Sequence, residues 1–508
     1  GGRSFETSWG SLGFVAVGGF DNSWQTRRGR QQEGIVENGA IVPRTDYDFT
    51  STQNDAVLNG LLGFGAEWGD HRLGWTNTYI HMTTKEARTR AGNDEGAGAI
   101  VRDDFTEWFE RELFGSQLTG THTFGALTID WRGSYATTSR SSPYEKGIRY
   151  RLVDDAWLHN ASQEQNYTRF GEVRDDVVSA GLDFTWTLRA SGRQDAVISA
   201  GLAWLDNDRE AEVREFRLLA LDGALPLEVQ RQRVDFLLSD VNVGPGRLTL
   251  RETTGADGAA AYDAGLEVSA AYVQLDAELV PLVRASIGVR YEDAEQFVTP
   301  RNLFGGPAPA SAPPLENDYL LPAATVTWNF YEDMQLRIGA SKTIGRPQFR
   351  ELAPQQYVDP DSDRLFIGNP FLVDTEIINL DARYEWYFDS GEFLTAGLFY
   401  KRLDRPIESI INDTGSTVQQ TFINAPEARL YGAEVEIRKY FRPPIDAAWW
   451  GENRLFVAAN YTYTDSEVKV REGDLVFPLS GDGAPGAISE QTARAMAERA
   501  RELTGSHF

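Results

Sequence analysis

Apolar and polar residues alternate in short runs along most of the chain. In the clearest run, 127–135, apolar and aromatic side chains take every second position and polar ones lie between them: Leu127, Ile129, Trp131 and Tyr135 against Thr128, Asp130, Arg132 and Ser134. Successive side chains of a β-strand point to opposite faces, so this period of two predicts strands with one apolar and one polar face. The chain is therefore predicted to be all-β.

A second stretch, 341–441, holds several such runs close together. Residues 379–386 and 394–401 both alternate, and the turn Asp389-Ser390-Gly391-Glu392 joins them, which favours a hairpin. Over the whole chain the pattern predicts about 15 strands, with short turns and long polar loops in alternation. Because outer-membrane barrels sort their connections in this way, the predicted architecture is a transmembrane antiparallel β-barrel.

The long polar stretches are predicted to be loops. They include 21–52 and 139–174, together with an extracellular insertion over 206–263 that holds small strands of its own. The last stretch, 465–508, is predicted to be an extracellular loop containing a short helix. The whole chain, 1–508, then forms a single, incomplete barrel domain.

The strand pattern also predicts sidedness. Each strand of about 9–11 residues crosses the bilayer once, so successive connections alternate between the two sides. The predicted periplasmic turns are 69–71, 124–125, 189–195, 331–333 and 389–392. The predicted cell-surface loops are those around Ser141, Gly223, Pro309, Asp361, Thr414 and Gly483.

Composition excludes several classes of function. The chain has no cysteine, which excludes disulfide scaffolds, thiolate metal sites and cysteine nucleophiles. Its formal net charge of -26 argues against a nucleic-acid partner. No apolar run reaches ~18 residues, so no membrane-spanning helix is predicted, and a closed barrel is the other way to satisfy the backbone in lipid.

Five phrases in the second stretch carry a family resemblance. In chain order they are Ser341-Lys342-Thr343-Ile344-Gly345-Arg346-Pro347-Gln348-Phe349-Arg350-Glu351-Leu352-Ala353-Pro354, Gly368-Asn369-Pro370-Phe371-Leu372, Asn379-Leu380-Asp381, Phe399-Tyr400-Lys401 with Pro406-Ile407-Glu408, and Gly432-Ala433-Glu434-Val435-Glu436. Together they resemble the barrel portion of TonB-dependent outer-membrane receptors, and the weaker alternation elsewhere extends the resemblance over most of the chain.

The resemblance implies a receptor in the outer membrane of a Gram-negative bacterium, and not an enzyme. Such receptors have a barrel of about 22 strands filled by an N-terminal plug, so the plug, the energy-coupling box and some C-terminal strands are expected to be missing. The implied function is active uptake of a scarce ligand, a siderophore, cobalamin, haem or an oligosaccharide, with no cofactor. The implied partners are the TonB-ExbB-ExbD complex, reached through the plug region, and outer-membrane lipid and lipopolysaccharide.

Two sets of residues are candidates for ligand contact. Aromatic and arginine side chains lie in or beside the loop that follows the Arg-Pro phrase, and guanidinium groups suit carboxylate or catecholate ligands. This set is Arg346, Arg350, Tyr357, Arg364, Phe366 and Phe371. The same arginines have a second interpretation, in which they only fasten the loop. The other set consists of charged positions on the predicted lumen wall, which either form a ligand path or bind a plug: Asp130, Arg132, Asp183, Arg290, Glu292, Arg337, Arg383, Glu434, Glu436 and Arg438.

Other functions remain as alternatives. A passive outer-membrane porin without a plug would share the strand pattern, and so would a soluble all-β carbohydrate-binding protein or enzyme. The many carboxylates would allow a glycosidase pair, yet no two stand at a spacing that defines an acid and a nucleophile. The acidic run Asp359, Asp361 and Asp363 has Arg364 where a calcium loop needs glycine. The five scattered histidines predict no metal site.

Overall fold

The structure is a computed structural model, and it describes most of the chain. The described residues are 1–37, 40–162, 165–188, 196–237, 239–243, 247–255, 260–304, 311–358, 365–413, 418–441 and 454–469. No helix in these ranges reaches the length and apolarity needed to cross a bilayer.

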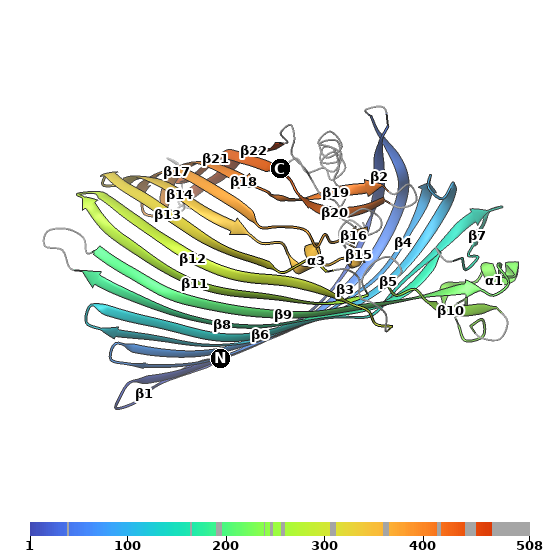
Figure 1. Cartoon of the computed structure of the whole chain (residues 1–508), viewed down its shortest axis with the longest axis horizontal. Helices are drawn as coiled ribbons and strands as arrows, with labels where there is room; N and C mark the ends of the chain where they lie inside the picture. The colour runs from blue at the N-terminus through green and yellow to red at the C-terminus, as the bar shows by residue number, and fades with distance from the viewer. Residues whose placement is uncertain are drawn as a thin grey trace, which may run out of the picture.

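One large antiparallel sheet dominates the fold and curves around a hollow (Figure 1). Its main strands follow the chain in the order β1-β2-β3-β4-β5-β6-β8-β9-β11-β12-β13-β14-β17-β18-β21-β22. The edge strands are β1 and β22, and no pairing joins them within the described ranges. Neighbours in sequence are therefore neighbours in space, as the predicted barrel requires.

The main strands differ greatly in length. The first group is long, at 23–29 residues: β2 (Ser11–Glu37), β3 (Ala40–Trp68), β4 (His71–Asp94), β5 (Ala99–Phe124), β6 (Leu127–Val153), β8 (Asn166–Leu188) and β9 (Ala196–Ala220). The last group has 12–15 residues: β14 (Met334–Gly345), β17 (Thr375–Asp389), β18 (Glu392–Asp404), β21 (Glu427–Phe441) and β22 (Leu455–Lys469). We call these groups the tall wall and the short wall. Between them lie β11 (Ala261–Val280), β12 (Val283–Arg301) and β13 (Leu315–Tyr331), and the short edge strand β1 (Gly2–Glu6) precedes the tall wall.

Register gives the sheet an apolar outer face. A row of mainly apolar side chains crosses six strands at one level: Trp131, Leu182, Leu202, Ala271, Tyr291 and Leu320. Many apolar side chains of this face are exposed, including Leu202 and Leu320. The neighbouring positions along each strand point the other way and are largely polar. An apolar exterior over a polar interior is the arrangement of a barrel that lies in lipid.

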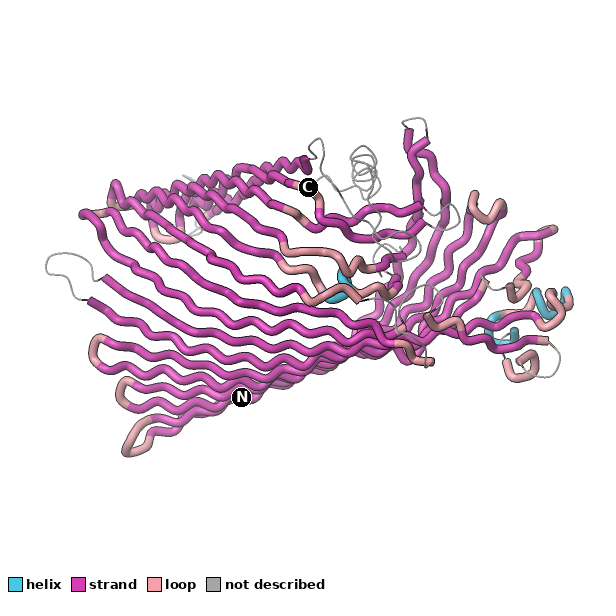
Figure 2. The backbone as a smooth tube through the Cα atoms, in the orientation of Figure 1, coloured by secondary structure: helices cyan, strands magenta, loops and turns pink. Residues whose placement is uncertain are grey.

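The short connections between strands gather at one end of the sheet (Figure 2). They include the turns after Trp68, Phe124, Val280, Tyr331 and Asp389. The long connections after Ala220, Arg301, Gly345 and Asp404 lie at the opposite end, so successive connections alternate between the two ends. The alternation in length holds only in part, because β3 begins at Ala40 soon after β2 ends at Glu37, and β5 begins at Ala99 soon after β4 ends at Asp94. The predicted turn at 189–195 lies outside the described residues.

Two predicted loops are wrong, because most of their residues extend the strands. Residues 21–37 and 40–52 belong to β2 and β3, and most of 139–174 belongs to β6 and β8. Beyond the bilayer both faces of a strand meet water, so the apolar half of the alternation disappears while the hydrogen-bond ladder continues. Ser141, predicted to lie in a surface loop, is therefore a strand residue that pairs with Glu110 and Glu172.

The connection after the tall wall forms a small lobe. Over 206–263 the chain continues β9 to Ala220, then makes α1 (Leu227–Gln230), α2 (Val234–Leu237) and β10 (Leu248–Glu252) before β11 begins. The lobe buries Ala161, Leu225, Val229 and Leu248, beside β7 (Ala156–Leu158). In the last predicted loop, 465–469 belongs to β22 and the rest lies outside the described residues.

A second, smaller sheet lies within the curve of the large one (Figure 1). Its strands are β15 (Gln356–Val358), β16 (Leu365–Ile367), β20 (Val418–Asn424) and β19 (Ile407–Asp413), in that spatial order. They come from the connections that leave the short wall after β14 and β18. These connections do not project outward but fold back over the inner face.

Candidate ligand-binding site

The connection from β14 to β17 packs against the inner face of the large sheet. We call its described residues, 346–358 and 365–374, the inward segment. A short helix in it, α3 (Phe349–Leu352), buries Phe349 and Leu352 against Tyr262, Ala264 and Val298 of β11 and β12. Burying aromatic and aliphatic side chains in this way fixes the segment against the wall.

Polar contacts fasten the first half of the inward segment to the large sheet. Nη2 of Arg346 lies 2.9 Å from Oε2 of Glu292, on β12. The side-chain amide of Gln296 donates to the carbonyl of Pro347 over 2.8 Å. Further along, the amide of Gln355 donates to the carbonyl of Ala260 over 2.8 Å. Arg346 is thus paired with the wall and is not part of the lining of the cavity described below.

Gly368 and Asn369 hold the return half of the segment against α3. A Cβ atom at position 368 would lie 2.2 Å from the carbonyl oxygen of Ala353, so only glycine allows this approach. The buried Asn369 donates from its side-chain amide to the carbonyl of Phe422, 2.9 Å away, and accepts from the amide of Phe371. The Gly-Asn-Pro phrase thus joins α3 to the small sheet.

A cavity of about 670 Å³ remains between the inward segment and the tall wall. Its volume lies in the range of small-molecule sites. The wall side is formed by inner-face residues of β4, β5, β6, β8 and β9, and the opposite side by Arg350, Ala353, Gln355 and Tyr357. A loop and a sheet far apart in sequence thus enclose one space.

Three arginines point cationic groups at this cavity. Arg111 and Arg140 lie opposite each other on β5 and β6, and Arg350 comes from α3. None of the three has a carboxylate within ion-pair distance among the described residues. Their contacts are with other groups: the Arg140 and Arg111 guanidinium carbons lie 4.4 and 5.6 Å from the Phe109 ring centre, and Arg350 donates to Gln348.

The two acidic residues of the lining have partners: Glu112 accepts from the hydroxyl of Tyr79 over 3.0 Å, and Asp175 accepts from Arg209. Arg209 makes two bonds to Asp175, of 2.6 and 2.8 Å, and its guanidinium carbon lies 5.2 Å from the Phe349 ring centre. Burial raises the pKa of Tyr262, which keeps the phenol protonated. The cavity therefore has a net positive lining in which the unpaired charge comes from Arg111, Arg140 and Arg350.

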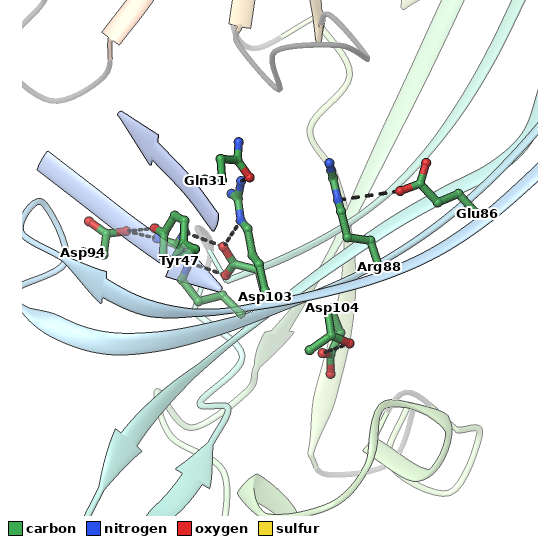
Figure 3. Close-up of polar contacts among 10 residues, drawn as sticks. Gln31, Tyr47, Glu86, Arg88, Asp94, Asp103 and Asp104 are labelled. Atoms are coloured by element: carbon green, nitrogen blue, oxygen red, sulfur yellow. Dashed lines mark hydrogen bonds and ion pairs between the residues drawn. The ribbon is translucent and has the colours of Figure 1, made fainter. Parts of the chain in front are cut away.

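Farther from the short turns than the cavity, an ion network joins strands of the tall wall on their inner face (Figure 3). Asp103 accepts from Arg149 at 2.7 and 2.8 Å and from Arg90 at 3.0 Å. Arg149 also binds Asp94, which accepts from the hydroxyl of Tyr47. Asp103 is 3% exposed, so these pairs stabilise the upper parts of β3, β4, β5 and β6 in a partly dry setting.

The predicted loop residues divide between the cavity and its support. Arg350 and Tyr357 line the cavity. Phe366 stacks between Tyr357 and Phe422, with 5.5 Å between ring centres on each side, so it supports the segment from behind. Phe371 is 40% exposed and is not part of the cavity lining. Arg364 lies outside the described residues.

Register places all ten predicted lumen-wall residues on the inner face. Asp130, Asp183 and Arg290 share one row with Tyr272, and Arg132 and Glu292 share the next. On the short wall the inner-face residues are Arg337, Arg383, Glu434, Glu436 and Arg438.

Many of these lumen-wall residues pair with one another near the short turns. Arg132 binds Asp183 at 2.5 Å, and the hydroxyl of Tyr272 donates to the same carboxylate. Arg290 binds Glu292 at 2.7 Å. These ion pairs neutralise charges that would otherwise be available to a ligand in the barrel interior.

Sequence reasoning missed Arg111, Arg140, Arg209 and Tyr262. Three of them lie in stretches taken as loops, where no face can be assigned to a side chain. Arg111 lies outside those predicted loops, and the signal for it would have been its place among the inward-facing positions of a strand. Cross-strand pairing of Arg111 with Arg140 was invisible without the register of β5 and β6.

The described residues hold no group of three or more histidine or acidic side chains arranged to bind a metal ion. Fold and cavity together define a class of protein: an outer-membrane-type β-barrel whose inward connections enclose a cavity. The chain matches the family described as TonB dependent receptor-like, beta-barrel, over residues 4–500. It therefore belongs to the TonB-dependent receptor family of outer-membrane barrels, which transports ligands.

Solved structures agree on the fold. The ferric yersiniabactin uptake receptor FyuA from Yersinia pestis matches with a TM-score of 0.50 and 12% sequence identity, covering 92% of this chain and 60% of that structure. The copper transporter OprC matches with a TM-score of 0.51 and 12% identity, covering 92% of this chain and 63% of that structure. The chain thus spans less than two thirds of either relative. No curated protein matches the sequence.

Proposed function

We propose that this barrel takes up a small anionic ligand by TonB-dependent transport and binds it in the cavity under the inward segment. The observation that carries the proposal is a set of three arginines, Arg111, Arg140 and Arg350, around one space of about 670 Å³. Within the described residues, none of the three forms an ion pair with a carboxylate. An anion there would gain charge-assisted hydrogen bonds from two sides.

The placement of Arg111 supports this function. Like charges directly opposite each other on neighbouring strands are destabilising, yet Arg111 faces Arg140 across β5 and β6. A ligand that carries carboxylate or catecholate oxygens would relieve this repulsion. A bare metal cation would increase it, and a neutral oligosaccharide would leave it unchanged.

The proposed ligand class is therefore a ferric siderophore with exposed anionic oxygens. The ferric yersiniabactin uptake receptor FyuA and the copper transporter OprC share the fold. The arginines favour the chelate over the free cation. In this proposal the protein is a receptor in the outer membrane, surrounded by lipid and lipopolysaccharide, and not an enzyme. The TonB-ExbB-ExbD complex supplies the energy through a plug region.

Binding of defined iron chelates to the purified full-length receptor tests the ligand class. We expect a ferric catecholate or ferric citrate to bind, and a neutral ferric hydroxamate or maltohexaose to bind far more weakly. Arg140→Ala and Arg350→Ala should each weaken binding of the anionic chelate by about 10- to 100-fold, the loss expected for a hydrogen bond to a charged group. Arg30→Ala is the matched control, because Arg30 pairs with Asp46 on the outer face.

Equal binding by the wild type and both cavity variants would refute the ligand site. Energy coupling is tested separately with radioactive iron in cells. Uptake that persists in a strain without TonB would show a passive porin instead of a coupled receptor.

A further inference from the structure

A hollow of about 500 Å³ opens on the outer face of β1 to β6, near the short turns. We call it the outer groove. Leu12, Ala66 and Leu73 lie opposite one another across β2, β3 and β4 and form one row of its lining. The next row toward the long loops includes Phe64 and Trp75, whose rings stack with centres 5.5 Å apart.

The hollow exists because small residues interrupt a row of large ones. Ala66 stands between Leu12 and Leu73, and position 120, opposite Leu73, is glycine. A Cβ atom at Gly120 would lie 2.3 Å from the ring of Trp131. The missing side chain lets Trp131 lie across β5 and close the far end of the groove.

A polar group lies at the end of the groove nearest the short turns. His71 is two residues from Leu73 on the same face, directly opposite His122. Trp9, Trp68 and Phe124 surround the pair, each in ring contact with a neighbour of this set. Tryptophan and other amphipathic rings at this level are typical of residues that meet lipid headgroups.

The hydrogen bonds determine which nitrogen is left to bind a ligand. Nε1 of Trp131 donates to Nε2 of His122 over 3.2 Å, so the proton of a neutral His122 is on Nδ1. That nitrogen lies 3.3 Å from Nδ1 of His71 and donates to it. The proton of His71 is then on Nε2, which has no partner in the described part of the chain. One N–H donor therefore remains beside an apolar groove.

We propose that the outer groove binds one phospholipid of the periplasmic leaflet, with an acyl chain in the groove and the phosphate accepting the Nε2–H of His71. The proposal rests on the outer-membrane location in the proposed function. The occupant follows from position and chemistry. The groove opens on the apolar face that meets lipid in this family, and its lining is almost wholly apolar. His71, two residues beyond Leu73 toward the short turns, offers a donor beside it.

Native mass spectrometry of the full-length receptor in detergent tests this proposal. The probes are dioleoylphosphatidylglycerol and dioleoylglycerol, which share acyl chains but differ in the phosphate. Ala66→Trp fills the groove, and Ala271→Trp adds the same bulk to the outer face between Leu202 and Tyr291. His71→Phe keeps a ring and removes the donor.

We expect the wild type and Ala271→Trp to retain one phosphatidylglycerol, and Ala66→Trp to bind it about tenfold more weakly or worse, because burial of methylene groups supplies most of the affinity. His71→Phe should weaken phosphatidylglycerol several-fold and leave dioleoylglycerol unchanged. Equal retention by Ala66→Trp and Ala271→Trp would overturn the proposal. So would a receptor dimer that Ala66→Trp abolishes, since the groove would then hold a second copy of the chain.

Two checks separate this result from the proposed function. All variants must show the shift in gel migration on heating that marks a folded barrel. Chelate binding in the arginine cavity, on the opposite face of the sheet, should be unchanged in Ala66→Trp and His71→Phe. Lipid loss with intact chelate binding would support the groove, and lipid retention with failed chelate binding would refute only the proposed function.

Discussion

The tall wall and the short wall differ by about twofold in strand length, yet both begin at the same level of short turns. A bilayer crossing needs only about 9–11 strand residues. The strands of the short wall, with 12–15 residues, use most of their length to cross. Those of the tall wall, with 23–29 residues, continue well beyond the crossing. The candidate cavity lies where a connection from the short wall folds toward the tall wall.

The two walls are also held together differently. Strands that rise above the lipid cannot rely on an apolar exterior, and the tall wall instead carries the buried network around Asp103 and Arg149. The short wall sends its connections inward, where Phe349 and Leu352 are buried against β11 and β12. In this protein, ion pairs join the parts of the tall wall beyond the bilayer, whereas apolar packing fixes the inward segment.

The largest expected effect is on labelling from outside the cell. The strands of the tall wall extend beyond the bilayer on the side of the long connections, so their ends there should lie at the cell surface. Cysteines replacing Glu95, between β4 and β5, and Ser311, before β13, should react with a membrane-impermeant maleimide on intact cells. Cysteines replacing Asp70 and Ser390, in short turns, should be protected until the outer membrane is permeabilised. The reverse pattern would invert the topology, and mixed labelling within either pair would refute the strand pairing.

Removal of the carboxylate at the centre of the ion network should destabilise the ends of the tall-wall strands farthest from the short turns. Asp103→Ala leaves Arg149 and Arg90 without their shared partner, and breaking a buried pair costs about 3–5 kcal/mol. Hydrogen–deuterium exchange should then rise in the upper parts of β4, β5 and β6, and remain low near the short turns. Asp46→Ala is the control, because its partner Arg30 is largely exposed and exposed ion pairs contribute little to stability. Similar exchange in the two variants would show that the network does not stabilise the wall.

A methyl group at Gly368 should loosen the inward segment without affecting the barrel. The added Cβ would overlap the carbonyl of Ala353, and overpacking of this kind costs about 1–3 kcal/mol. Gly368→Ala should speed proteolytic cleavage within 346–374 and weaken binding of the anionic chelate. Gly339→Ala is the matched control, since its nearest neighbour, 3.8 Å away, leaves room for the methyl group. Unchanged cleavage and binding in Gly368→Ala would contradict the close packing.

The smallest effect should come from the aromatic stack behind the cavity. Phe366→Leu removes ring contacts with Tyr357 and Phe422, and the expected loss of local stability is about 1 kcal/mol. The same proteolysis assay should detect a modest change. Phe371→Leu, at a largely exposed position, should stay within about 0.5 kcal/mol of the wild type. A larger effect from Phe371→Leu would mean that the support of Tyr357 lies elsewhere.

The sequence predicted the barrel wherever a strand lies in lipid. The run from Leu127 to Tyr135 alternates because its two faces meet hydrocarbon and a polar interior, and the structure confirms that strand. Farther along the same strand, around Arg140, both faces are wet, and pattern alone could not distinguish strand from loop. The length of the strands, and therefore the tall wall, could not be predicted from the sequence pattern.

The site was predictable only from its loop side. Arg350 and Tyr357 were found because they follow a recognisable phrase, and the cavity includes both. Arg111 and Arg140 become significant only as a cross-strand pair, which depends on the register of two strands. The inward direction of the segment depends on packing between Phe349 and residues of β11 and β12, which no local pattern reports.

The cavity takes its cationic groups from two parts of the chain separated by about two hundred residues, with Arg111 and Arg140 on one side and Arg350 on the other. Under the proposed function, ligand preference therefore depends on both parts of the chain. A chimaera that receives only the inward segment of a relative would place new side chains against an unmatched set of wall cations. Under the proposed function, a substitution at Arg140 should be tolerated best in a background that already differs at Arg350.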